Sequence, residues 1–142
     1  MTTPLGSDGR SVNKPAVIAS VVAAFERYEA ALLSNDLDVL DRLMWRDPRV
    51  VRVGIDDRQD GFAAISAFRR SLPRQAPPRV LRDTAVVTFD DHTAVITTTF
   101  VPTDGSPWGR QSQTWVRMAE GWRIVAAHVS APMSASRQAL DP

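Results

Sequence analysis

The sequence contains no cysteine among its 142 residues. Disulfide bonds, thiolate nucleophiles, zinc–thiolate sites and iron–sulfur clusters are therefore excluded. An excess of one charge is also lacking, because 17 Lys and Arg residues stand against 16 Asp and Glu residues, a formal net charge of +1. Such a chain lacks the basic footprint of nucleic-acid-binding proteins, so we expect no nucleic-acid partner.

Long apolar runs are absent as well. No apolar segment reaches the roughly 18 residues that a membrane-spanning helix needs. The first eleven residues are polar and lack the apolar region of a signal peptide. We therefore expect no membrane association and a cytoplasmic location.

Patterns that bind metals or phosphate groups are lacking too. The two histidines, His92 and His128, lie far apart in the sequence and form no helical pair. Since cysteine is also absent, we assign no metal site. Neither a glycine-rich phosphate loop nor a serine nucleophile elbow is present. We therefore expect a protein that works without a cofactor.

What the sequence does contain is typical of one globular domain. The composition is 44% hydrophobic and 23% charged, as in ordinary folded proteins, and the length fits a single domain. We expect this domain to span residues 13–132. Residues 1–12 and 133–142 are rich in small and polar residues, and we expect both segments to be flexible tails.

Apolar residues recur at helical spacing in three segments of the first half. The first segment follows Asn13, which is placed to cap a helix, and its apolar stripe includes Tyr28, the only tyrosine. Asp36 is placed to cap a second, short helix, which ends before Asp47–Pro48 because a residue that precedes proline disfavours helix. A third helix is predicted over Gly61–Leu72.

Strand-like segments dominate the second half. A short strand is predicted earlier, at residues 49–53, and a polar turn follows it at residues 54–60. The pattern then predicts four β-rich runs joined by short polar turns, at residues 80–89, 93–101, 110–118 and 122–130. Helices followed by an antiparallel meander indicate the α+β class.

The last of these runs is apolar on both faces. Its alternating positions form two apolar sets, Trp122, Ile124 and Ala126 on one parity and Val125, Ala127 and Val129 on the other. An antiparallel sheet normally leaves one face in water. We therefore expect the helices to cover one face and a second copy of the chain to cover the outer face, which makes the protein a homodimer.

Several segments carry a resemblance to a known family. They include Phe25–Leu32 (FERYEAAL), Trp45–Gly54 (WRDPRVVRVG) and Gly61–Arg69, and above all the strand pair Gly109–Arg117 (GRQSQTWVR) and Gly121–Ser130 (GWRIVAAHVS). These segments resemble the AtzH-like family, which includes the oxalurate catabolism protein HpxZ, within the SnoaL-like, nuclear-transport-factor-2-like superfamily. The resemblance covers about residues 14–131. It implies a cone-shaped, curved antiparallel sheet wrapped around three N-terminal helices, a cystatin-like roll with a pocket inside.

The resemblance also implies an activity. Members act in ureide and triazine nitrogen catabolism, and the expected reaction is the cofactor-free hydrolysis of a small anion, such as 1,3-dicarboxyurea or an oxalurate-like amide. The proposed acting pair of the family corresponds to Tyr28 and Arg52. This sequence departs from the pattern at Val53, where an aromatic residue is expected, and in the polar loop at residues 56–59. Those departures bear on the substrate more than on the fold.

The chemistry of these residue types supports the same two positions. The phenol of Tyr28 can exchange a proton with substrate, although a tyrosine on an apolar helix stripe is also typical of a core. The guanidinium of Arg52 can clamp a planar carboxylate, although an arginine within a strand also suits the wet face of a sheet. A second clamp is expected from Arg110, the preferred choice, or from Arg69 or Arg123.

Other candidates line the predicted strands. Gln111 and Gln113 can recognise a ureide through amide donors and acceptors, and they share a face with Trp115. A sheet edge or a satisfied polar network explains these glutamines equally well. His128, near the end of the last run, is a candidate base or a structural contact.

Two functions stay open at this level. The first is the hydrolase just described. The second is a non-catalytic, dimeric protein that binds a small anionic ligand or docks on a partner amidase, which the weak catalytic constellation favours.

Overall fold

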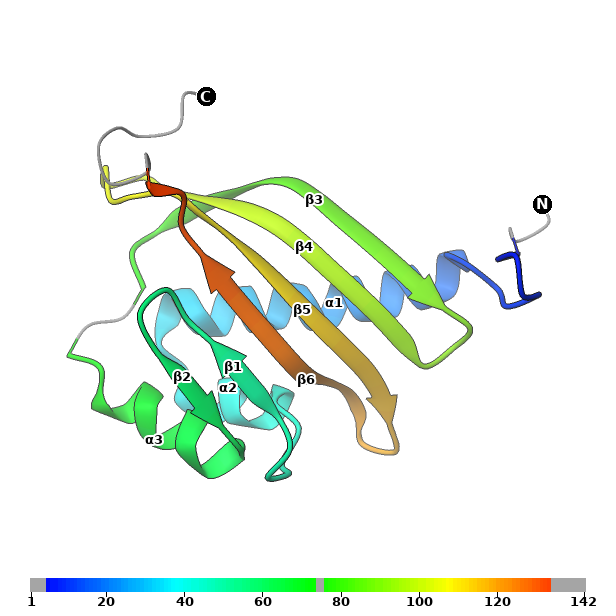
Figure 1. Cartoon of the computed structure of the whole chain (residues 1–142), viewed down its shortest axis with the longest axis horizontal. Helices are drawn as coiled ribbons and strands as arrows, with labels where there is room; N and C mark the ends of the chain where they lie inside the picture. The colour runs from blue at the N-terminus through cyan, green and yellow to red at the C-terminus, as the bar shows by residue number, and fades with distance from the viewer. Residues whose placement is uncertain (1–4, 74–75, 134–142) are drawn as a thin grey trace.

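The helices and strands build an α+β fold, as predicted. The computed structural model describes residues 5–73 and 76–133. The elements follow the order α1 (Pro15–Ser34), α2 (Leu37–Leu43), β1 (Val51–Val53), β2 (Arg58–Asp60), α3 (Phe62–Ser71), β3 (Arg79–Phe89), β4 (Thr93–Pro102), β5 (Gly109–Met118) and β6 (Gly121–Ser130). One curved sheet runs in the order β2-β1-β6-β5-β4-β3, and the helices lie against its inner face (Figure 1).

The first helix forms where the apolar stripe predicts it. Its buried residues include Val21, Phe25 and Tyr28, and it ends at Asn35, whose left-handed backbone (φ 56°) closes the last turn. The side chain of Asp36 then accepts a hydrogen bond from the backbone N–H of Val39, so it caps α2 as predicted.

The start of α1 differs from the prediction. Lys14, not Asn13, occupies the cap position, and no side chain of the described part of the chain caps the helix. The side-chain oxygen of Asn13 instead accepts a hydrogen bond from the backbone N–H of Thr88, at 2.8 Å. The backbone N–H of Asp90 also donates to the carbonyl of Ser11. The end of the predicted N-terminal tail is thus hydrogen-bonded to the end of β3. Of the predicted C-terminal tail, residues 134–142 lie outside the described residues.

The meander of β3 to β6 is confirmed, and its bounds agree with the prediction within two residues. The polar turn predicted at residues 54–60 is wrong in its second half, because Arg58–Asp60 forms β2 and pairs antiparallel with β1. The first strand, β1, also pairs in parallel with β6. Three-residue strands are too short to show a periodic pattern, and the pairing of β1 with β6 joins residues that are 75 positions apart in the chain.

A β-bulge changes the interpretation of the two apolar parities in β6. Trp115 pairs with Ile124, but Thr114 pairs with Ala126, so Val125 is an extra residue between them. The inward-facing residues are therefore Trp122 and Ile124 before the bulge, and Ala127 and Val129 after it, as their partners on β5 require. The bulge moves the inward-facing set from one parity to the other. Apolar residues on both parities of β6 therefore belong in part to the same inner face, and that part does not require a dimer.

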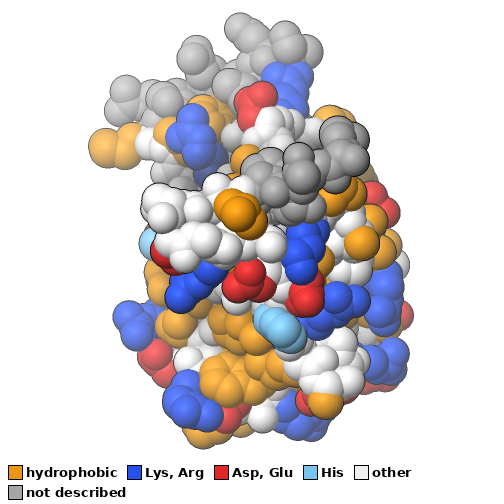
Figure 2. All heavy atoms as spheres, turned by 90° about the vertical axis from the view of Figure 1, so that its right-hand side faces the viewer, with side chains coloured by type: hydrophobic (Ala, Val, Ile, Leu, Met, Phe, Trp, Pro, Cys, Tyr) orange, Lys and Arg blue, Asp and Glu red, His pale blue; other side chains and the backbone are white. Residues whose placement is uncertain are grey.

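The core lies between the helices and the inner face of the sheet. Its fully buried side chains are Trp115, Leu40, Leu43, Ile65, Ile96, Ile124, Val21, Val50 and Thr88. At the end of the molecule where α1 begins, acidic and basic side chains are interspersed with hydrophobic ones (Figure 2), in keeping with the near-neutral composition. Within the described residues, no helix is long and apolar enough to cross a membrane.

Candidate active site

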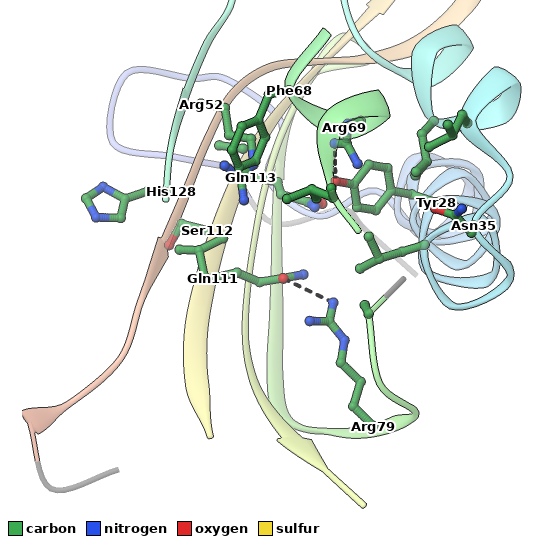
Figure 3. Close-up of a pocket in the computed structure, with 17 residues that line it drawn as sticks. Tyr28, Asn35, Arg52, Phe68, Arg69, Arg79, Gln111, Ser112, Gln113 and His128 are labelled. Carbon is green, nitrogen blue, oxygen red and sulfur yellow. Dashed lines mark hydrogen bonds between the residues drawn. The ribbon is translucent and has the colours of Figure 1, made fainter. Parts of the chain in front are cut away.

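A cavity of about 240 Å³ opens between the helices and the inner face of the sheet. Its charged and polar lining includes Tyr28 from α1, Arg52 from β1, Arg69 from α3, and Gln111 and Gln113 from β5. Figure 3 shows these side chains around one space, although they are up to 85 positions apart in the sequence. The fold therefore brings Tyr28 and Arg52 to one cavity, as expected, and Arg69 joins them.

The most direct contact in the cavity joins Tyr28 to Arg69. Arg69 donates a hydrogen bond from Nη2 to the phenol oxygen of Tyr28 at 2.7 Å, and both residues are buried. The phenol oxygen thus serves as an acceptor, and among the described residues no acceptor receives the proton of the phenol itself. The phenol is left as a hydrogen-bond donor in the cavity, beside a guanidinium.

A polar network occupies one end of Arg52. Its Nη1 donates to Asp57 Oδ1 at 2.7 Å and to Gln59 Oε1 at 3.0 Å, and Gln59 Nε2 donates to the same Asp57 oxygen at 2.9 Å. The ring of Phe68 lies under the guanidinium, 5.2 Å from its central carbon. Arg52 is thus held in place, and Asp57 balances its charge.

A second arginine, Arg79, is paired still more completely. It binds the carboxylate of Glu29 with both ends of its fork, Nε to Oε2 at 2.6 Å and Nη2 to Oε1 at 2.8 Å. Nη2 also donates to Gln111 Oε1 at 3.2 Å. Because an arginine can only donate, that contact identifies the oxygen of the Gln111 amide and turns its Nε2 elsewhere.

Two buried donors of the cavity have no hydrogen-bond partner among the residues that the structure describes. They are Nε of Arg69 and Nε2 of Gln111, on side chains whose residues are only 8% and 7% exposed. Buried donors are normally satisfied, and an unsatisfied one costs stability. Their presence in one cavity is typical of a site that awaits a ligand with hydrogen-bond acceptors.

Gln113 and Trp115 serve the core as much as the cavity. The indole Nε1 of Trp115 donates to Gln113 Oε1 at 3.1 Å, and the indole meets the Tyr28 ring edge-on, with ring centres 6.4 Å apart. Trp115 is fully buried and does not line the cavity. It positions Tyr28 from behind.

The structure places three candidates away from the Tyr28–Arg69 contact. Arg110 is exposed, and its neighbours on the strand face inward, so it points to the outer side of the sheet and lies against Trp108. His128 is exposed and lines the cavity at its edge, apart from the Tyr28–Arg69 contact (Figure 3). Arg123 bonds to backbone carbonyls near the β5–β6 turn. The second guanidinium at the site comes from α3 rather than from β5.

The sequence interpretation missed Arg79, Glu29, Asp57 and Gln59. The partners Arg79 and Glu29 lie 50 positions apart, so no local pattern connects them. Asp57 and Gln59 lie in the polar loop already noted, but only their contact with Arg52 shows what they do. Among the described residues, no group of three or more His, Asp or Glu is arranged to hold a metal ion.

Comparison with known proteins now identifies the family. The family model described as AtzH-like matches residues 10–135 of the chain. The chain belongs to the AtzH-like family. No curated protein matches it.

Solved structures agree with this membership. A protein of unknown function from Pectobacterium atrosepticum is 46% identical, with a TM-score of 0.83, over 91% of this chain and 99% of that one. A cystatin-like fold protein from Burkholderia xenovorans is 44% identical, with a TM-score of 0.82, over 87% and 97% of the two chains. An NTF2-like protein from Pseudomonas putida shares the fold at 18% identity, with a TM-score of 0.73 over 91% and 99%.

Proposed function

We propose that this AtzH-like protein is a cofactor-free hydrolase of a small carboxylated urea or an oxalurate-like amide. The observation that carries the proposal is the 2.7 Å bond from Arg69 to the phenol oxygen of Tyr28 inside the cavity. That bond leaves the phenol proton available to a ligand. It also provides a cation beside the oxygen that becomes negative when the proton is given up.

The reaction follows from this arrangement. The phenol of Tyr28 donates its proton to the nitrogen that carries the carboxyl group, and the electron pair of the breaking C–N bond goes to that nitrogen. The carboxyl carbon leaves as carbon dioxide, which water converts to bicarbonate. Arg69 stabilises the phenolate, which then recovers a proton from water. In an oxalurate-like amide, water instead adds to the carbonyl carbon before the C–N bond breaks.

Substrate binding is assigned to the guanidinium groups and amides around the cavity. Arg69 and Arg52 face the ligand from α3 and β1, and Gln111 offers its free amide donor. Arg69 takes the place that the sequence interpretation gave to Arg110. The small cavity and its several donors suit a compact ligand with carboxylate and carbonyl oxygens.

A turnover assay tests the proposal. We expect the purified protein to accelerate the breakdown of 1,3-dicarboxyurea or of oxalurate. A Tyr28→Phe variant should lose about 100-fold or more of that rate, because proton transfer by a positioned side chain contributes on that order. An Arg110→Gln variant, changed on the outer face, should keep it. Full activity in Tyr28→Phe would remove the phenol from the mechanism.

A non-catalytic binding function is the second candidate. It is favoured by the bonds that hold Arg52 and Arg79 to Asp57 and Glu29, because such a network suits recognition without a reaction. In this case the ligand binds without turnover, and the protein co-purifies with a partner amidase.

Pairing of two copies through the outer sheet face is part of either proposal. Val87 and Phe89 are 38% and 40% exposed, and both pair with outward-facing positions of β4. Light scattering measures the oligomeric state, and a monomer at micromolar concentration would contradict the pairing.

A further inference from the structure

The guanidinium of Arg52 is held by three neighbours. Gln59 lies opposite Arg52 in the pairing of β1 with β2, so both side chains stand on the same face of the sheet. Asp57 and Gln59 accept from one nitrogen, Nη1, and the ring of Phe68 lies against the guanidinium (Figure 3). Within residues 5–73 and 76–133, no acceptor bonds to Nε or Nη2 of this arginine. The held guanidinium therefore keeps one two-donor edge for a ligand.

Glycine at position 54 leaves the space in which Asp57 reaches Arg52. The backbone N–H of Gly54 donates to the carbonyl of Asp57 at 2.8 Å, which closes the turn after β1. A Cβ at position 54 would lie 2.5 to 2.8 Å from the carboxylate atoms of Asp57, well inside van der Waals contact. Gly54 is not among the residues with positive φ, so space, and not backbone conformation, requires glycine here.

We propose that Gly54 and Asp57 are positioning residues, which fix Arg52 so that its Nε–Nη2 edge faces the ligand. This inference deepens the proposed function and rests on it for the role of Arg52 in binding. Asp57 acts through the oxygen that orients the guanidinium, and Gly54 acts by giving that oxygen room. A guanidinium that is already fixed loses less side-chain entropy when a carboxylate binds than a mobile one does.

A purely electrostatic role of Asp57 predicts the opposite effects. If Asp57 only offsets the charge of Arg52, then Asp57→Asn should tighten the binding of an anion. Gly54→Ala, which moves the same carboxylate away from the guanidinium, should tighten it as well. In the positioning role, Gly54→Ala keeps every charge but weakens binding, whereas Asp57→Asn keeps an oxygen that accepts from Arg52 and does not weaken it.

The order of the Arg52 side chain is measured first, in the ligand-free protein. NMR of the guanidinium nitrogens, assigned by comparison with Arg52→Lys, follows the rotation of the Nη groups, which bound acceptors slow. Rotation should be at least about tenfold faster in Gly54→Ala and in Asp57→Ala, the size expected from the loss of a charge-assisted hydrogen bond. Asp57→Asn should rotate as slowly as the native chain.

Two results of this measurement would overturn the inference. One is an unchanged rotation rate in Asp57→Ala, or in Gly54→Ala if that variant folds, as thermal unfolding shows. The other is fast rotation in the native chain. Asp57 lies in a loop and its side chain is 34% exposed, so Asp57→Ala still decides the question if Gly54→Ala fails to fold.

Steady-state kinetics then measure what the positioning does. The probes are oxalurate and 1,3-dicarboxyurea. Gly54→Ala should raise KM about five- to tenfold and leave kcat nearly unchanged, because the cost of ordering one side chain weakens binding of substrate and transition state alike. Asp57→Asn should not raise KM. A KM that falls or stays the same in Gly54→Ala would contradict the positioning role.

Two control variants match these changes at other places. Gly6→Ala adds the same Cβ at a glycine where its nearest atom would lie 3.4 Å away. Asp60→Ala removes a carboxylate from the same strand pair, where it binds the exposed Arg58. Neither should change KM or the rotation of the Arg52 guanidinium. A rise in KM as large as that of Gly54→Ala in either control would show that the effect is not specific to Arg52.

The outcome separates this inference from the proposed function. If Arg52 is ordered and becomes mobile in Gly54→Ala, but the native protein turns over neither 1,3-dicarboxyurea nor oxalurate, the positioning is supported and the hydrolase is rejected. If either compound is turned over and KM is unchanged in Gly54→Ala, the hydrolase is supported and the positioning is rejected.

Discussion

The two ends of the inner face of β5 have opposite characters. At one end Trp115 is fully buried, and its single donor is satisfied by Gln113. At the other end Gln111 is almost as deeply buried, yet its Nε2 has no partner within residues 5–73 and 76–133. Both residues have the same orientation on the same strand and lie only four positions apart. Their difference shows where a continuous core becomes a binding site: a core satisfies its polar groups internally, and a site leaves some of them for a ligand.

The covering elements account for the change. The apolar stripe of α1 packs over the Trp115 end, where Tyr28 meets the indole edge-on. Past Tyr28, the cavity is lined by Arg69 from α3 and by Arg79 from β3. These long charged side chains, together with apolar ones such as Leu32, Phe68 and Leu72, surround the cavity.

The largest effect is expected at the core end. Trp115→Ala should lower the free energy of unfolding by about 3–5 kcal/mol, because it removes a fully buried indole and leaves a void beside Tyr28. Denaturant titration measures the change. Trp45→Ala, at a partly exposed indole, should cost clearly less. A loss of under about 1 kcal/mol in Trp115→Ala would show that the core end is loosely packed after all.

The buried ion pair at the cavity end should come next. Glu29→Gln keeps the shape of the side chain but leaves Arg79 without a carboxylate, and the Arg79 side chain is only 8% exposed. Breaking a buried pair in this way costs about 3 kcal/mol. Thermal and denaturant unfolding measure it, and a double variant with Arg79→Gln should recover part of the loss. Equal free energies of unfolding in Glu29→Gln and in the double variant would show that Arg79 is not left as an uncompensated buried charge.

The sharpest test compares the two glutamines of β5 directly. Gln113→Leu should destabilise the fold by about 1–3 kcal/mol, because the indole N–H of Trp115 loses its acceptor in a dry environment. Gln111→Leu should change stability by no more than about 0.5 kcal/mol. It loses the 3.2 Å bond from Arg79 Nη2, which still binds Glu29, and it removes an Nε2 donor that is already unsatisfied. The same denaturant titrations measure both. If Gln111→Leu lowers the free energy of unfolding as much as Gln113→Leu does, the two ends of β5 do not differ as core and binding site.

The smallest effect on the free energy of unfolding is expected at exposed ion pairs such as Arg49–Asp47. Such pairs provide a reference for the buried pair of Glu29 and Arg79. A hydrogen bond from the side chain of Arg49 lowers the pKa of Asp47 below its ordinary value of 3.8. The folded pKa then lies below the unfolded one, so the stabilising contribution is full above pH 3.8 and is lost as the pH falls through the folded value.

An NMR titration of the Asp47 carboxyl checks this direction. In Arg49→Gln the pKa of Asp47 should rise toward 3.8, but only part of the way, because the backbone N–H of residue 49 still donates to Asp47 Oδ1. Stability at pH 7 should not change measurably, since water screens an exposed pair. An unchanged pKa of Asp47 would exclude the side-chain bond as its cause.

Local patterns were sufficient for the regular elements and for part of the site. The apolar stripe that includes Tyr28 predicted α1, Asp36 predicted the start of α2, and the alternation within β3 to β6 predicted the meander, because each signal lies within one element. The resemblance to the family then pointed to Tyr28 and Arg52. The strand at Arg58–Asp60 was missed, because it exists only through its pairing with β1.

The amino-acid sequence by itself determined the α+β class, the family and the exclusion of thiol chemistry, because these depend on composition, periodicity and contiguous motifs. Only the tertiary structure decided which arginines share a cavity and which are neutralised. Arg110 and Gln111 are neighbours in the chain, but the pleat of β5 turns one to the outer face and the other to the cavity. Arg69 and Tyr28 are 41 positions apart, yet the fold brings the guanidinium of one to 2.7 Å from the phenol oxygen of the other. The charge of a site depends on distances through space, and no local pattern records those distances.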